Sequence, residues 1–110
     1  MITTHVLDTA KGRPAAGVAV VLEIRRASGW TFIGRGVTDA HGRLADLMGE
    51  VALSPGTYRL TFDTGPYLQL NHKAAFYPTV PIVFEIRDAD GHYHVPLLVS
   101  PYGFSTYRGS

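Results

Sequence analysis

The sequence of 110 residues contains no cysteine, so neither a disulfide framework nor a thiolate metal site is possible. Its longest apolar run, Val18 to Leu22, is far too short to cross a bilayer. The net charge is only +1, and lysine and arginine are scattered, which leaves no electrostatic footprint for nucleic acid. The residues after Met1 form no basic or apolar leader region, so a cytoplasmic protein is expected.

Glycine and proline, in contrast, are abundant. The 12 glycines and 7 prolines exceed the average combined usage of roughly 12%, and they separate short stretches rich in Val, Leu, Ile, Thr, Tyr and Phe. This spacing predicts one all-β sandwich domain over residues 1–110, with a short helix over Pro66 to Phe76. Strands are predicted over residues 2–8, 18–26, 31–37, 43–47, 57–63, 79–87, 92–99 and 102–108.

Alternation along the first and last strands predicts which side chains face away from the core, because successive strand residues point to opposite faces. Outer faces that mix histidine, leucine, proline and tyrosine are typical of a lined cleft or a subunit interface. The residues expected to face inward are Ile2, Thr4, Val6, Tyr93, Val95, Leu97 and Val99. The residues expected to face outward include His5, His92, His94, Ser105 and Tyr107.

Taken singly, the polar residues carry little information. His92 and His94 have a spacing that could chelate Zn²⁺, but no cysteine or aspartate completes a tetrahedral set, so no metal is expected. His5 alone is typical of a hydrogen-bonded strand histidine. Arg43 follows a turn that its aspartate and glycine predict, and by itself indicates only a solvated side chain. No serine lies in a Gly-x-Ser-x-Gly elbow, which leaves a serine nucleophile unsupported.

Read together, four segments resemble the transthyretin-like family on its hydrolase branch. They are THVLDTAKGRPAAGVAVVL near the start, TDAHGR in the middle, FYPTVPIVFEI after the helix and HYHVPLLVSPYGFSTYRGS at the end. True transthyretins share the VLD and PYxxST segments but differ where His5, Arg43, His94 and the final YRGS stand here. The pattern GxPxxGxxVxL…TDxxGxL…LxPGTYxL of residues 12–60 also occurs in prealbumin-like modules and indicates only the fold.

The resemblance implies a transthyretin-like (prealbumin-like) two-sheet sandwich of eight strands with one short helix. It implies a homotetramer, a dimer of dimers, with sites in the channel between the dimers. The implied activity is hydrolysis of 5-hydroxyisourate to 2-oxo-4-hydroxy-4-carboxy-5-ureidoimidazoline in urate degradation, without a cofactor. By matching motif positions, the expected catalytic residues are His5, Arg43, His94 and Ser110, and the expected substrate-binding residues are Tyr107, Arg108 and Gly109.

Opening a lactam ring with water requires a base, donors for the developing oxyanion and groups that hold the ring. Histidine titrates near neutrality, so either His5 or His94 is the expected base, with the other positioning the water or passing the proton to the ring nitrogen. The planar fork of Arg43 suits the substrate carbonyls. Two other functions stay open: a carrier of a small aromatic ligand, and a structural module of a larger surface protein. A carrier pocket needs shape and apolar walls rather than two histidines and Arg43.

Overall fold

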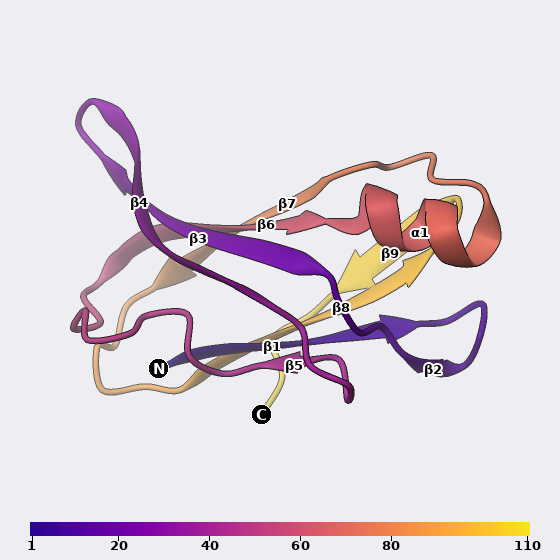
Figure 1. The fold of residues 1–110 in the computed structure, drawn as a ribbon. Coiled ribbons are helices and arrows are strands. Elements are labelled where there is room, and N and C mark those ends of the chain that lie inside the picture. Colours follow the sequence, from indigo (N-terminus) through magenta and orange to yellow (C-terminus); the bar gives the residue numbers. More distant parts are fainter.

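The computed structural model describes residues 1–110 as two stacked sheets with one short helix (Figure 1). The predicted all-β sandwich is therefore confirmed. The strands in chain order are β1 (Ile2–Asp8), β2 (Arg13–Pro14), β3 (Ala19–Arg26), β4 (Gly29–Val37), β5 (Arg43–Leu44), β6 (Gly56–Asp63), β7 (Val80–Ile86), β8 (Tyr93–Ser100) and β9 (Gly103–Thr106), and the helix is α1 (Thr64–His72).

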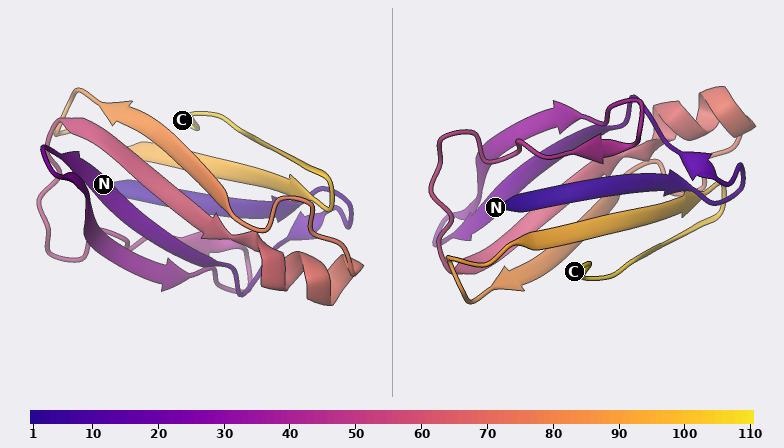
Figure 2. Two further views of the ribbon diagram at one scale, coloured as in Figure 1. Left: turned by 90° about the horizontal axis from the view of Figure 1, so that it is seen from above. Right: turned by 90° about the horizontal axis from the view of Figure 1, so that it is seen from below.

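The two sheets differ in how they use the ends of the chain. One has the strand order β4-β3-β6-β7, and the other has the order β2-β1-β8-β9 with β5 also paired to β1. β1 and β8 run parallel, in register from Ile2 opposite Tyr93 to Asp8 opposite Val99. Beyond β9 the C-terminal segment runs back along β8 (Figure 2). Residues from both ends of the sequence therefore lie side by side in one sheet.

The helix differs from its prediction at both ends, because it begins before Pro66 and ends before Phe76. It ends at His72 because Lys73 adopts the left-handed conformation, with φ of 57°. The Lys73 N–H then donates to the carbonyl oxygen of Gln69 at 3.0 Å, which closes the last turn.

The strands differ from their predictions mainly in length. The two-residue strand β2, which pairs with the end of β1, is missing from the prediction. β5 covers only Arg43–Leu44, and Leu47 at the end of the expected range is buried in the core. β9 ends at Thr106, which forms the last pair of its ladder with β8, opposite Leu97.

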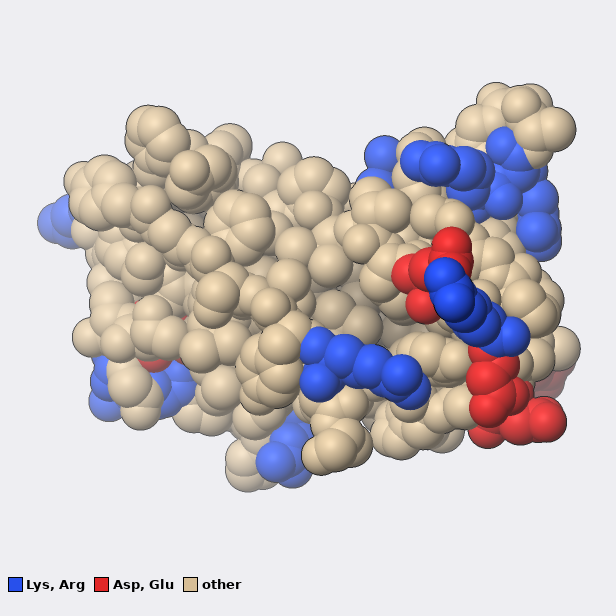
Figure 3. Space-filling model, turned by 180° about the vertical axis from the view of Figure 1, so that it is seen from behind, with Lys and Arg blue, Asp and Glu red and all other residues tan.

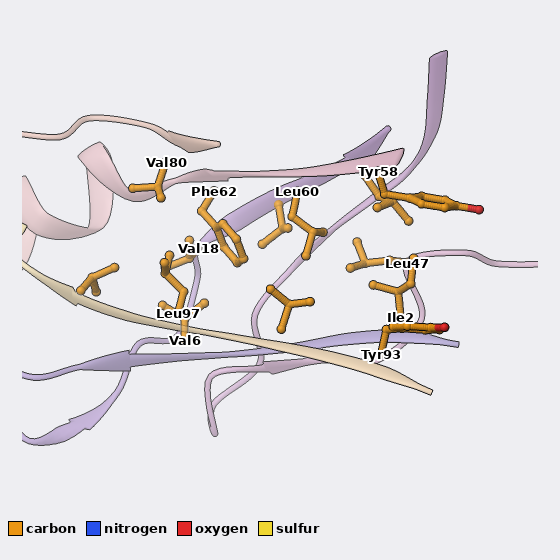
Figure 4. Packing of buried hydrophobic residues seen from close by; sticks show 14 of the residues in the cluster. Ile2, Val6, Val18, Leu47, Tyr58, Leu60, Phe62, Val80, Tyr93 and Leu97 are labelled. Carbon is orange, nitrogen blue, oxygen red and sulfur yellow. The ribbon is translucent and has the colours of Figure 1, made fainter. Parts of the chain in front are cut away.

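The core is one cluster of 19 buried apolar residues enclosed by the two sheets. Val6 and Leu97 of one sheet face Leu60 and Phe62 of the other (Figure 4). Each fully buried side chain of this size contributes about 1.5–3 kcal/mol to folding, which fixes the face that each strand turns inward. The seven residues expected to face inward from β1 and β8 are all buried, as predicted. The side chains between them must therefore point out of the sandwich.

Asp8 at the end of β1 is a buried carboxylate that attaches α1 to the sheet. Tyr67 Oη donates to Asp8 Oδ2 at 2.7 Å, and His72 Nε2 lies 2.7 Å from the same oxygen. The backbone N–H groups of Ala10 and Lys11 donate to Oδ1, each at 3.0 Å. Burial alone raises the pKa of Asp8, but the hydrogen bonds from His72, Lys11 and Tyr67 outweigh it and hold the pKa below its ordinary value.

Charged side chains are spread over the surface. On the face seen from behind, arginine side chains gather near the β3–β4 hairpin, and another basic side chain lies against acidic ones (Figure 3). The Arg25 and Arg59 guanidinium carbons lie 5.0 and 4.3 Å from the centre of the Trp30 ring, and Arg59 also pairs with Glu23. No helix in the structure has the length and apolar character needed to span a membrane.

Candidate functional site

The parallel pairing of β1 and β8 brings three imidazole side chains to one side of the sheet. Thr3 lies opposite His94, and His5 lies opposite Pro96. His5 and His94 are half-buried because they alternate with core residues, whereas His92 precedes β8 and is exposed. The histidines face away from the core, as predicted.

A tight turn brings Arg43 to the same place. Asp39 Oδ1 accepts hydrogen bonds from the backbone N–H groups of His41 and Arg43 at 2.8 and 3.0 Å, and these bonds lower the pKa of Asp39. Gly42 has φ of 75°, in the region that favours glycine, and its carbonyl oxygen accepts from Val6 N–H at 2.7 Å. The turn thereby docks on β1 with Arg43 opposite His5 in the register.

The hydrogen bond of His5 fixes which of its ring nitrogens is free. Its Nε2 lies 2.8 Å from the carbonyl oxygen of His41, and a carbonyl oxygen can only accept. Nε2 therefore carries a proton and donates it to that oxygen. The nitrogen that remains for other partners is Nδ1.

His94 has the most perturbed surroundings of the three histidines. Its Nδ1 lies 2.8 Å from Thr3 Oγ1, and Nε2 has no partner within the chain. Burial lowers the pKa of His94 below its usual value, and the nearby positive charge of His5, His92 and Arg43 lowers it further. The lowered pKa favours the neutral form of the His94 imidazole, which has one unprotonated ring nitrogen and can accept a proton.

The C-terminal segment closes over this imidazole. Gly109 forms a single antiparallel bridge with His94, and its N–H donates to the His94 carbonyl oxygen at 2.8 Å. Only glycine fits this close approach, because a Cβ atom there would lie 2.5 Å from His94 Cδ2. The guanidinium carbon of Arg108 lies 4.6 Å from the centre of the Tyr93 ring. Ser110 is thereby carried to the outer side of β8.

A pocket of about 350 Å³ lies where these elements meet. It brings together three of the predicted site residues, Arg43, His94 and Ser110. His5 borders it through its pairing with Arg43, and Gly109 packs on His94. The remaining lining residues are Thr3, Thr4, Leu44, Ala45 and His92.

Tyr107 and Arg108 lie elsewhere, in a second pocket of about 320 Å³ at the open edge between the sheets. Tyr107 shares that pocket with the inward-facing Tyr93 and Val95. The structure therefore does not bring Tyr107 and Arg108 into the pocket that holds Arg43, His94 and Ser110. β9 ends at Thr106, opposite Leu97, but the bridge of Gly109 with His94 continues the same antiparallel register along β8.

Thr3 belongs to the pocket and was missed by the sequence reasoning. Its Oγ1 contacts His94 Nδ1 at 2.8 Å and His92 Nε2 at 3.1 Å. Alternation places Thr3 on the same face as His5, and this signal was present in the sequence. Its contact with the histidines depends on the register of β1 with β8, which the sequence alone does not give. No group of three or more histidine, aspartate or glutamate side chains is arranged to hold a metal ion.

These residues define a polar pocket with an imidazole whose Nε2 has no partner, an arginine whose guanidinium has no acidic partner in the chain, and hydroxyl groups from Thr3 and Ser110. An imidazole of this kind accepts a proton from water, and a guanidinium stabilises negative charge that develops on an oxygen. The chemistry that the pocket supports is addition of water to a polar carbonyl compound.

Comparison with known proteins defines the class. The family model described as HIUase/Transthyretin family matches residues 2–109, and the chain belongs to this family. A 5-hydroxyisourate hydrolase of Salmonella dublin is 47% identical over 110 residues, which is 100% of this chain and 81% of that protein.

Two solved structures extend the comparison. A 5-hydroxyisourate hydrolase of Klebsiella pneumoniae superposes with a TM-score of 0.85 at 37% identity, covering 99% of this chain and 98% of that one. A sea bream transthyretin in complex with thyroxine superposes with a TM-score of 0.90 at 35% identity, covering 98% and 93%. The fold is thus common to a hydrolase and a transthyretin that binds thyroxine, and the side chains of the site must distinguish the two functions.

Proposed function

We propose that this protein hydrolyses 5-hydroxyisourate to 2-oxo-4-hydroxy-4-carboxy-5-ureidoimidazoline in urate degradation. The observation that carries the proposal is the His94 imidazole, whose Nε2 has no partner in the chain, in one pocket with Arg43 and Ser110. The similarity to named 5-hydroxyisourate hydrolases supports the same substrate. A carrier of an apolar ligand would gain nothing from an arginine without an acidic partner in one pocket with an imidazole whose Nε2 is free.

In the proposed mechanism, His94 Nε2 accepts a proton from water as the water oxygen attacks a ring carbonyl carbon. Arg43 stabilises the oxyanion that forms, and Ser110 donates a hydrogen bond to the substrate. The ring C–N bond then breaks, and its nitrogen takes up the proton held by His94. His5 is assigned to the second proton-handling position, through Nδ1, because Nε2 is bonded to the His41 carbonyl oxygen.

The proposal extends to assembly and location. The present chain shares its fold with the sea bream transthyretin, and its own pocket lies on the outer face of the sheet that contains β1 and β8. We propose a homotetramer, a dimer of dimers, with the pockets in the channel between dimers, working in the cytoplasm. Tyr107 and Arg108 would then contribute to substrate binding through the assembled channel rather than through the pocket of one subunit. Sedimentation velocity of the purified protein measures the subunit number.

The test of the activity generates 5-hydroxyisourate in situ from urate with urate oxidase and follows its transient ultraviolet absorbance. The protein should accelerate the decay, and His94→Gln should reduce kcat by about 10²–10⁴-fold. Arg43→Gln should also lose activity, whereas Arg26→Gln, an arginine far from the pocket at the end of β3, should not. Decay at the spontaneous rate in the presence of the folded protein would refute the proposed function.

A further inference from the structure

Thr3 contacts two histidines, and neither contact takes part in the proposed mechanism. Thr3 Oγ1 lies 2.8 Å from His94 Nδ1 and 3.1 Å from His92 Nε2. All three residues line the pocket. Their proximity follows from the parallel register, in which Thr3 is directly opposite His94.

Proton counting limits how the three groups bond. A threonine hydroxyl has one hydrogen and two lone pairs, and a neutral imidazole has one N–H and one unprotonated nitrogen. Thr3 can therefore donate to only one of the two rings, and the other ring must donate to Thr3. If Thr3 donates to His92, the proton of His94 is on Nδ1 and its Nε2 lone pair is free. If Thr3 donates to His94, the proton of His94 is on Nε2 and that nitrogen cannot act as a base.

The charges around His94 favour the first arrangement. Nδ1 is in contact with Thr3, so Nε2 is the ring nitrogen without a partner, and Arg43 lines the same pocket as the ring. The unprotonated nitrogen is the negative end of the imidazole dipole, and the positive guanidinium attracts it more than it attracts an N–H group. The exposed His92 ring can then accept the Thr3 hydrogen through Nε2 and keep its own proton on Nδ1, in contact with solvent.

We propose that Thr3 and His92 form a positioning network that holds the proton of His94 on Nδ1, so that Nε2 presents its lone pair to the pocket. This inference rests on the proposed function, in which Nε2 takes the proton of water. Thr3 touches neither the water nor the substrate carbonyl in this scheme, and it acts only through His94. In other histidine bases a carboxylate orients the imidazole, and in this network the neutral hydroxyl of Thr3 has that role.

The experiment replaces Thr3 and reads the proton position directly. Imidazole ¹⁵N chemical shifts of the free protein distinguish a protonated from an unprotonated ring nitrogen, and this measurement needs no substrate. Wild type should show His94 with Nδ1 protonated and Nε2 unprotonated. Thr3→Val should lose this preference and lower kcat by about 10–100-fold, the range for partners that orient a functional imidazole. KM should change little, and Thr3→Ser should restore both the shifts and kcat.

Two further variants separate positioning from folding. Thr9→Val removes a hydroxyl that donates to the Val99 carbonyl oxygen, also between β1 and the end of β8 but without an imidazole, and should leave kcat unchanged. His92→Phe removes the acceptor of the Thr3 hydrogen and should shift the proton of His94 part of the way toward Nε2. If Thr3→Ser folds and Thr3→Val does not, the comparison of wild type with Thr3→Ser and His92→Phe still tests the network.

The proposal is overturned if wild-type His94 carries its proton on Nε2, or if Thr3→Val leaves the ¹⁵N shifts and kcat at wild-type values. A protein that does not accelerate the decay of 5-hydroxyisourate would refute the proposed function. In that case the ¹⁵N shifts of wild type and Thr3→Val still decide whether Thr3 sets the proton position of His94.

Discussion

Gly109 offers a direct test of how the C-terminal segment positions the site. An alanine Cβ there would lie 2.5, 3.3 and 3.4 Å from His94 Cδ2, Cγ and Cβ. Carbon atoms pack at about 3.5–4.0 Å, so the backbone at position 109 and the His94 ring must separate by roughly 1 Å. Gly109 is outside the left-handed region, so alanine adds this steric conflict without backbone strain. The bridge from Gly109 N–H to the His94 carbonyl oxygen, 2.8 Å in the wild type, must lengthen.

Gly109→Ala should therefore lower kcat/KM for 5-hydroxyisourate by about 10²-fold, the cost of a displacement of about 1 Å in a catalytic group. The thermal midpoint should stay close to wild type, because the segment buries little surface. Gly103→Ala is the matched control: its Cβ would meet only Ser100 Oγ, at an ordinary 3.7 Å. Equal kcat/KM values for Gly109→Ala and Gly103→Ala would contradict the reasoning, and so would a large loss of stability in Gly109→Ala.

Two further predictions concern the fold. Asp8→Asn should lower the free energy of unfolding at pH 7 by about 1.5–3 kcal/mol, because Tyr67 and His72 lose a charged partner. The pKa of Asp8 is lower in the folded state, so its contribution to stability is present above the unfolded pKa of about 3.9 and is lost as pH falls through the folded pKa. Urea titrations should therefore show that the difference in unfolding free energy between wild type and Asp8→Asn shrinks below pH 4. A difference at pH 3 as large as that at pH 7 would contradict this prediction. Gly34→Ala places a Cβ 1.9 Å from the backbone oxygen of Leu47, in the segment between β5 and β6. The substitution should lower the urea midpoint by an amount equivalent to about 1–3 kcal/mol. An unchanged midpoint would show that the segment around Leu47 moves freely.

The sequence predicted the parts of the fold that depend on alternation and turn residues. The inward faces of β1 and β8 follow from side-chain periodicity, and the turn before Arg43 follows from its aspartate and glycine. These local signals need no knowledge of which strands pair. The helix end at His72 was missed because a left-handed Lys73 is not the residue that usually closes a helix.

The sequence could not predict features that depend on strand pairing. Thr3 meets His94 only because β1 and β8 are parallel and in one particular register. Tyr107 and Arg108 line the pocket at the open edge between the sheets, which forms only where β7 and β8 approach one another in space. The family resemblance named Tyr107 and Arg108, but a resemblance carries residue positions and not the direction in which a side chain points.

Two lining residues of the pocket differ in how firmly they are held. His94 lies between the buried Tyr93 and Val95, so the core fixes its backbone on both sides. Ser110, another lining residue, is held by its neighbour Gly109, which is attached to β8 by a single backbone bridge. A segment with so few contacts can adjust around a substrate, while the imidazole that must meet the water stays in place. This difference explains why a glycine that packs directly on His94 should affect catalysis far more than stability.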